Sequence, residues 1–350
     1  MTANTASKKI CVLGGGGFLG SHLVEALIAR TPHAVHAVDL SFAKLTLASP
    51  RLTCATASIA DPGVLEQAIA GCAAVVSTTA LCNPALYNTR PIEVIHANFT
   101  HLVPLVELCQ RRASWLIHFS TCEVYGKETL DAAGAVLAMS EDHSPLLLGP
   151  IQRERWTYAC AKQLLERLIY AAGKHGDLKF TIVRPFNVIG PRMDYLPGLD
   201  GDGVPRVLAC FMRSLLCGEP LQLVDGGVNR RSFVYVDDFV DAVLRIVERP
   251  AACHGEVINI GNPANDLTIA ELAQRMAATY QRLSGRDRRI ELRHVAAASF
   301  YGPGYDDTRQ RIPDIAKAQR LLDWSPRTSL DAMLPSIVRD YIERYGSSAP

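Results

Sequence analysis

The sequence predicts an α/β protein with a doubly wound parallel sheet and a smaller C-terminal lobe. Short apolar runs alternate with helically periodic segments through the first half of the 350-residue chain, an arrangement typical of parallel strands joined by helices. The first apolar run ends in a glycine cluster that opens the next helical segment. After about Gly190 the alternation loosens, and prolines and glycines at positions 191, 197, 198, 201, 203 and 205 indicate loops that cross into the second lobe.

Hydrophobic periodicity separates the strands from the helices. Residues 10–13 form one continuous apolar run, whereas apolar residues at 23, 24, 27 and 28 recur at helical spacing. The same criterion, applied along the chain, predicts strands at Lys9–Leu13, Ala34–Val38, Leu52–Ile59, Ala74–Thr79, Trp115–Ser120, Phe180–Val183 and Glu256–Ile260. It predicts helices at Ser21–Arg30, Pro91–Cys109, Gln152–Ala172, Thr268–Leu283 and about Leu330–Tyr345.

Composition argues against several classes of function. The formal net charge is +1, so the chain offers no general electrostatic field for nucleic acid or membranes. It contains no run of about 18 apolar residues that could span a bilayer, and the short polar N-terminal segment does not resemble a secretory signal. The ten cysteines include no C-x-x-C pair and no zinc-finger spacing. We therefore expect a cytoplasmic protein with free thiols and without a bound metal.

The glycine cluster has the spacing of a dinucleotide-binding turn. Gly14, Gly17 and Gly20 form G-x-x-G-x-x-G between the first strand and the first helix, with Phe18 and Leu19 inside the pattern. The missing side chains let the backbone approach a pyrophosphate, and the helix N-terminus supplies N–H donors. A plain tight turn would need glycines as well, so the interpretation depends on the position between strand and helix.

An acidic residue at the end of the second strand indicates which dinucleotide is bound. Asp39 lies 19 residues after Gly20, where a carboxylate accepts hydrogen bonds from both ribose hydroxyls and repels a 2′-phosphate, so NAD is favoured over NADP. A turn or helix cap is the alternative role for Asp39. Asp61, after the third strand, could contact the adenine ring or cap the following helix.

A tyrosine and a lysine are candidates for proton transfer. Tyr158 and Lys162 are spaced i,i+4 and so share one face of a predicted helix. A lysine ammonium and a nicotinamide charge can lower the phenol pKa, which would make Tyr158 a base for a substrate hydroxyl. Thr121, after the fifth strand, could share that proton. A helix surface pair is the other interpretation of the same spacing.

Four motifs occur together in this order: the glycine turn, Ser120-Thr121, the Tyr158/Lys162 pair and Arg184-Pro185-Phe186-Asn187. With them the chain resembles, from about residue 8 to 345, the extended short-chain dehydrogenase family of nucleotide-sugar epimerases, dehydratases and decarboxylases, which have a Rossmann fold. WTYACAK (156–162), RMD (192–194), YDD (305–307) and RIP (311–313) are similar to UDP-glucuronate decarboxylases. LCNP (81–84), YNTRP (87–91), TCEVYG (121–126), GVPRVLACF (203–211) and LVDGG (223–227) are similar to the UDP-apiose/UDP-xylose synthases of that family.

The resemblance implies an NAD-dependent conversion of UDP-glucuronate to UDP-apiose and UDP-xylose. Oxidation of the 4-hydroxyl gives a ketone β to the carboxylate, and a β-keto acid loses carbon dioxide readily. The same ketone permits a retro-aldol break and an aldol closure that contract the ring, and re-reduction of the sugar regenerates NAD.

The resemblance also implies roles for individual residues. Arg311 and Arg155 are candidates to bind the carboxylate, with a surface position as the alternative for Arg155, and Asp307 and Tyr305 would lie near Arg311. The proton transfers of ring contraction are assigned to Glu123, Cys82, Cys122 and Tyr87. The remaining implied contacts are those of Leu81 with NAD and of Asn187, Arg206, Asp225 and Arg231 with the uridine diphosphate or the sugar.

Two other functions remain open. One is a UDP-glucuronate decarboxylase that forms only UDP-xylose or UDP-4-keto-pentose, and the other is a non-catalytic NAD-binding regulator. We expect residues 1–190, with about 232–262, to form the NAD-binding Rossmann domain, and residues 191–231 and 263–350 the UDP-sugar-binding lobe. The family resemblance implies a homodimer packed through the helices at Pro91–Cys109 and Gln152–Ala172.

Overall fold

The computed structural model describes residues 7–201, 205–286, 290–301 and 306–346. Its centre is a seven-stranded sheet with the strand order β11-β6-β5-β4-β1-β2-β3, and every neighbouring pair is parallel. The predicted α/β class and doubly wound sheet are confirmed. The strands are β1 (Lys9–Leu13), β2 (Ala34–Asp39), β3 (Leu52–Thr56), β4 (Ala74–Ser77), β5 (Trp115–Phe119), β6 (Phe180–Pro185) and β11 (Glu256–Ile260).

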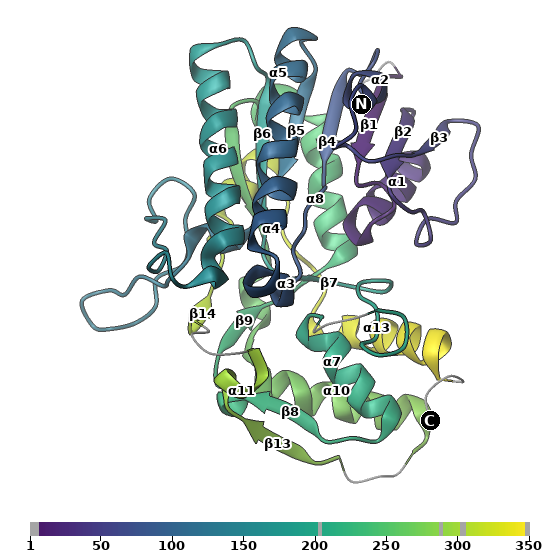
Figure 1. Ribbon diagram of the computed structural model, residues 1–350. Helices are drawn as coiled ribbons and strands as arrows, with labels where there is room; N and C mark the ends of the chain where they lie inside the picture. Colours follow the sequence, from purple (N-terminus) through teal and green to yellow (C-terminus); the bar gives the residue numbers. More distant parts are fainter. Residues whose placement is uncertain (1–6, 202–204, 287–289, 302–305, 347–350) are drawn as a thin grey trace.

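Helices cover both faces of this sheet (Figure 1). Ile10 and Val12 of β1 pack with the apolar side chains of α1 (Phe18–Arg30) and α8 (Val236–Glu248). Cys11 and Leu13, which alternate with them, pack with the core on the other face, against α2 (Val64–Ala68), α5 (Val103–Arg111) and α6 (Thr157–His175). Burial on both faces explains why β4 and β5 read as continuous apolar runs rather than as alternating patterns.

Two predicted helices differ from those observed. The segment predicted as one helix over Pro91–Cys109 is divided into α4 (Pro91–Asn98), a 3-10 turn η1 (Thr100–Leu102) and α5. Pro104 explains the break, since it has no N–H to continue a helix and its ring would clash with the carbonyl four residues earlier. The helix predicted at Gln152–Ala172 begins instead as a 3-10 turn η3 (Glu154–Trp156) and continues as α6 to His175.

The smaller lobe lies beyond the carboxyl ends of the strands, at the bottom of Figure 1. Its helix α10 (Ile269–Ser284) begins with a capping box between Thr268 and Glu271, which satisfies amide donors at the helix start. The lobe also contains α7 (Val207–Cys217), β8 (Leu221–Val224), β13 (Leu292–Val295), α11 (Ala297–Tyr301) and α13 (Leu330–Tyr345).

The remaining short elements lie within or between the two parts. They are α3 (Pro84–Thr89), β7 (Val188–Ile189), β9 (Arg230–Ser232), β10 (Val234–Tyr235), α9 (Pro250–Cys253), β12 (Asp266–Thr268), β14 (Gln310–Arg311) and α12 (Ala316–Leu322). The sheet β12-β9-β14 brings segments far apart in sequence together beside the cavity described below. Within the described ranges, every helix is too short or too polar to cross a membrane.

Candidate active site

A cavity of about 550 Å³ lies between the carboxyl ends of the strands and the smaller lobe. Thr78, Ser120 and Pro185 line it from the ends of three sheet strands. Leu208 and Ile269 line it from the lobe. The strand order reverses between β4 and β1, and ligands of open α/β sheets bind outside the carboxyl ends of the strands at such a point.

The glycine turn is shaped for a close backbone approach. Gly14 has φ +82°, and a Cβ on Gly20 would overlap the carbonyl oxygen of Gly14. Gly17 is the N-cap of α1 and has no side chain to occupy the first amides of the helix. These residues fit a pyrophosphate at the start of α1, whose first residues are Phe18 and Leu19, and Leu19 lines the cavity.

Asp39 lies directly against this turn. Its Oδ2 accepts a hydrogen bond from the Gly16 amide at 2.9 Å, and its Oδ1 accepts one from Leu40 N at 2.6 Å. The carboxylate thus caps its own turn and also faces the glycine cluster. Asp61 is exposed, and the N-cap of α2 is Gly63, so the capping role considered for Asp61 is wrong. The Leu81 backbone is held by Asn98, whose side chain bonds both its N and its O.

Tyr158 and Lys162 are both buried, so the interpretation of a surface pair is wrong. The Tyr158 ring stacks on Tyr87, with centroids 5.2 Å apart and planes 7° apart. Lys162 Nζ donates to the carbonyl oxygen of Phe119 at 3.1 Å. Burial lowers the pKa of Lys162 to about 8, while Cys82 and Glu166 act in the opposite direction.

The protein by itself raises the pKa of the Tyr158 phenol well above its usual value. Burial is the main cause, Cys82 and Glu123 add to it, and a hydrogen bond with Thr121 opposes it. The Thr121 hydroxyl is itself fixed, because it accepts the Glu123 amide at 3.1 Å as the N-cap of the 3-10 turn η2 (Cys122–Tyr125). A usable phenolate at this position therefore depends on positive charge beside it.

The two cysteines singled out in the sequence differ in environment. Cys82 is exposed at the cavity wall and acts electrostatically on both Tyr158 and Lys162. Cys122 is buried at the same cavity, and burial raises its pKa, an effect that Arg311 opposes. Cys122 is therefore a thiol, not a thiolate, at neutral pH.

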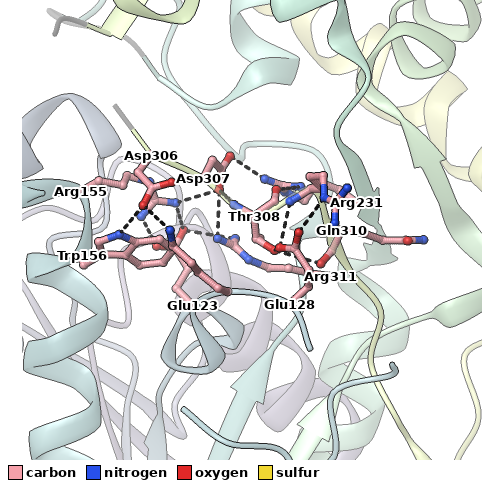
Figure 2. A network of polar contacts seen from close by, with 12 residues as sticks. Glu123, Glu128, Arg155, Trp156, Arg231, Asp306, Asp307, Thr308, Gln310 and Arg311 are labelled. Atoms are coloured by element: carbon pink, nitrogen blue, oxygen red, sulfur yellow. Dashed lines mark hydrogen bonds and ion pairs between the residues drawn. The ribbon is translucent and has the colours of Figure 1, made fainter. Parts of the chain in front are cut away.

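Three arginines and two carboxylates form a buried network beside these residues (Figure 2). Arg155 Nη1 and Nη2 donate to Glu123 Oε2 and Oε1 at 2.6 and 3.1 Å, and Arg311 Nη1 lies 3.6 Å from Glu123 Oε1. Asp307 pairs with Arg231 at 2.6 Å and with Arg311 at 3.2 Å. Within this set of five described residues, three positive charges face two negative ones, so the set has one positive charge in excess.

The arginines decide the ionisation of the two carboxylates. Burial alone would raise the pKa of Asp307, but Arg231, Arg311 and Arg155 hold it well below its usual range. The pKa of Glu123 is lowered in the same way by Arg155 and Arg311, against the effect of burial. Arg155 is only 5% exposed, so the alternative of a surface arginine is wrong.

The cavity wall nearer the lobe holds the residues expected to contact the nucleotide. Asn187 (φ 33°) donates to the Ser232 carbonyl at 3.1 Å, and Asp225 (φ 45°) accepts the Ala297 amide at 2.9 Å. Arg206 pairs with Asp194 at 2.7 Å. All three expected residues line the cavity. Arg231 also lines it, within the charge network, and Tyr305 lies outside the described residues.

Sequence reasoning missed the contacts that hold the 306–311 segment over the site. Asp306 accepts from Trp156 Nε1 at 3.2 Å and pairs with Lys127 at 2.9 Å. Thr308 donates to Glu128. Asp194 pairs with Arg206, and its place in the RMD motif (192–194) is the signal in the sequence that could have indicated a role for it.

Comparison with known proteins gives consistent matches along the chain. Residues 10–261 match the family described as "NAD dependent epimerase/dehydratase family". UDP-D-apiose/UDP-D-xylose synthase 1 of Arabidopsis thaliana is 46% identical over 348 residues, covering 93% of this chain and 89% of the relative. UDP-D-apiose/UDP-D-xylose synthase of Oryza sativa subsp. japonica is 46% identical over 345 residues, covering 93% and 87%.

Solved structures share the whole fold. The PbgP3 protein of Burkholderia pseudomallei has a TM-score of 0.83 and 31% identity, covering 98% of this chain and 97% of that one. UDP-glucuronic acid 4-epimerase of Bacillus cereus, solved with UDP-glucuronic acid and NAD, has a TM-score of 0.78, 24% identity and coverage of 96% and 100%. At that identity the epimerase is evidence for the fold alone.

Proposed function

Since this chain belongs to the NAD dependent epimerase/dehydratase family, we propose that it converts UDP-glucuronate to UDP-apiose and UDP-xylose. The observation that carries the proposal is the buried arginine network with one excess positive charge, which opens on the same cavity as Tyr158, Cys82 and Cys122. A substrate carboxylate would balance that charge. The 46% identity to enzymes named for UDP-D-apiose and UDP-D-xylose supports the same two products.

The residues divide the chemistry among them. The glycine turn of Gly14, Gly17 and Gly20 would hold NAD, which would supply the hydride acceptor for oxidation of the sugar and the donor for its re-reduction. Tyr158, with Lys162 and Thr121, takes the proton of the 4-hydroxyl. Arg311, with Arg155, holds the carboxylate until the bond to carbon dioxide breaks.

Ring contraction requires further proton transfers where the bond between carbons 2 and 3 breaks and a new bond closes through carbon 4. Cys82, Cys122, Glu123 and Tyr87 surround Tyr158 at the cavity, and we assign these transfers to them. Asn187, Arg206, Asp225 and Arg231 would hold the uridine diphosphate portion, since an arginine fork suits phosphate.

Product analysis tests the proposed function directly. After incubation with UDP-glucuronate and NAD, NMR of the products should show both UDP-apiose and UDP-xylose. UDP-xylose or UDP-4-keto-pentose alone would identify a plain decarboxylase. Unchanged UDP-glucuronate would indicate a non-catalytic NAD-binding regulator.

The cysteines distinguish ring contraction from decarboxylation. Cys82→Ser and Cys122→Ser are nearly isosteric, but a serine hydroxyl is far less acidic than a thiol. Each variant should lower the ratio of UDP-apiose to UDP-xylose by about tenfold or more, because general acid–base groups contribute roughly 10²–10⁴-fold. Cys54→Ser, at an exposed position on the edge strand β3, is the control. If both variants gave the parent's product ratio at the parent's rate, neither thiol would take part in the proton transfers.

Cofactor choice should depend on the charge of Asp39. Asp39→Asn keeps an acceptor for the Gly16 amide but removes the repulsion of a 2′-phosphate. We expect it, like Asp39→Ala, to narrow the preference for NAD over NADP by about tenfold, or ~1.4 kcal/mol. Fluorescence titration with both cofactors measures this, with Glu66→Ala, an exposed change on α2, as control. Equal binding of NAD and NADP by the unmutated protein would contradict the assignment.

We also propose a homodimer packed through α4 and α6. Ile92 and Ile95 on α4 and Leu164 on α6 are exposed, which is unusual for isoleucine and leucine on neighbouring helices. Analytical ultracentrifugation that finds a monomer would reject the proposed homodimer.

The division into residues 1–190 with 232–262, and 191–231 with 263–350, remains our prediction for the NAD-binding and sugar-binding parts.

A further inference from the structure

A second buried ion pair lies behind the active site. Arg184 Nε and Nη2 donate to Glu166 Oε1 and Oε2 at 3.0 and 2.7 Å, and each residue is 5% exposed. Neither is among the residues that line the cavity, so neither is placed to touch the sugar or the cofactor. Burying two charges is costly, and a buried pair is weak evidence for stability.

Both partners belong to elements of the site. Glu166 lies on α6 four residues after Lys162, which puts the two side chains on the same helix face. Arg184 lies on β6 immediately before Pro185, and Pro185 and Asn187 line the cavity. The pair thus joins the helix that carries Tyr158 and Lys162 to the strand that leads into the cavity wall.

Aromatic and amide side chains fix the arginine in turn. The Arg184 guanidinium lies 4.7 Å from the centre of the Tyr125 ring, in the turn that carries Cys122 and Glu123. The Tyr125 hydroxyl donates to Asn259 Oδ1 at 2.8 Å, and Asn259 Nδ2 donates to the carbonyl oxygen of Met139 at 2.8 Å. Glu166 therefore has little freedom, and the position of its charge is set by the sheet.

The surroundings of Lys162 make that charge important. The titratable groups that face Lys162 are Tyr158 and Glu166 on α6, Cys82 after β4 and His118 on β5. Burial and the nearby ammonium lower the pKa of His118 far below its usual value, so it is neutral. Glu166 is the one carboxylate among these four groups.

We propose that the Glu166–Arg184 ion pair is a positioning unit that holds Lys162 as an ammonium ion beside Tyr158. Glu166 supplies the negative charge, and Arg184, held by Tyr125, keeps that charge at one place on the face of α6. The inference rests on the proposed roles of Tyr158 and Lys162 in oxidising the sugar. It makes Glu166 and Arg184 determinants of the upper pH limit of that step, although neither touches the substrate.

The test is the titration of Lys162 in Glu166→Gln, which keeps the volume and removes the charge. In protein labelled with carbon-13 lysine, the ε-carbon signal of Lys162, assigned with Lys162→Met, should titrate about one pH unit lower than in the parent. The alkaline limb of the pH profile for UDP-glucuronate oxidation should move by the same amount in the same direction. Glu107→Gln, an exposed change on α5, should move neither.

Glu166→Gln leaves Arg184 buried without its carboxylate partner, which could prevent folding. A double variant tests the proposal in that case. Glu166→Leu/Arg184→Met removes both buried charges, a replacement that folds tolerate better than the loss of one partner. Its Lys162 signal should shift downward by less than in Glu166→Gln, because the opposing charge of Arg184 is lost as well. A Lys162 titration equal to the parent's in the folded variants would overturn the inference. Since this NMR measurement needs no turnover, it is independent of whether UDP-glucuronate is the substrate.

Discussion

Replacing Tyr158 by phenylalanine is expected to lower the rate of sugar oxidation by roughly 10²–10⁴-fold, with NAD still bound. Only the hydroxyl is lost, and with it the proton acceptor and the hydrogen bond to Thr121. The ring remains to stack on Tyr87 at 5.2 Å, so the cavity wall should keep its shape. The absorbance of reduced nicotinamide in a single turnover with UDP-glucuronate measures the oxidation step.

The control for this variant lies on the same helix. Tyr170→Phe changes a half-exposed tyrosine on α6 and should leave the rate unaltered. If Tyr158→Phe oxidised the sugar within about threefold of the parent, another group would have to be the base. Loss of NAD binding in the variant would instead indicate a structural role for the hydroxyl.

Arg311→Ala is expected to weaken UDP-glucuronate far more than UDP-xylose. Without Arg311 the two carboxylates balance the two remaining arginines, and the excess charge available to the substrate carboxylate disappears. Truncating one partner of a buried charge pair costs about 2–5 kcal/mol, which corresponds to roughly 30-fold to several thousand-fold in kcat/KM. UDP-xylose lacks the carboxylate, and its dissociation constant should change only a few-fold.

Calorimetric titration with both ligands compares these affinities. Arg309→Ala is the matched control, because Arg309 lies two residues before Arg311, is exposed, and pairs with Glu128. Arg311→Lys keeps the charge but not the planar fork and should give an intermediate loss. A comparable loss for both ligands would mean that Arg311 contacts the nucleotide or acts only in folding.

Stability measurements separate folding from binding in the Arg311→Ala variant. The native pKa values of Glu123 and Asp307 are lowered, so their pairing stabilises the fold above the unfolded-state pKa near 4, and this contribution is lost on acidification. The difference in melting temperature between parent and variant should therefore be largest near neutral pH and shrink as the pH falls below about 4.

Most of the correct predictions depend on features that lie within a short stretch of the sequence. The glycine turn was predictable because a strand, three spaced glycines and a helix follow one another within a dozen residues, and backbone clashes at Gly20 depend only on that turn. The strands were predictable from apolar runs. The error at Pro91–Cys109 was also local, because Pro104 was present in the sequence and its effect on a helix is known.

The charge network could not be derived from the residues alone. Arg155 could be interpreted as a surface residue because the carboxylates that pair with it lie far away in the sequence. Its partners are Glu123, 32 residues away, and Asp307. Family resemblance alone pointed to Arg155 and Arg311, and it did not indicate that they share the same two carboxylates.

The sequence by itself determined the parallel sheet, the position of the dinucleotide turn and the pairing of Tyr158 with Lys162 on one helix face. Each depends on neighbours within a few residues, where backbone geometry decides the outcome. Tertiary structure alone decided which charges are buried together, that Cys122 stays a thiol, and that the Tyr158 phenol needs positive charge to ionise. Those properties depend on desolvation and on Coulomb interactions between segments far apart in the chain, which only folding brings within a few ångströms of one another.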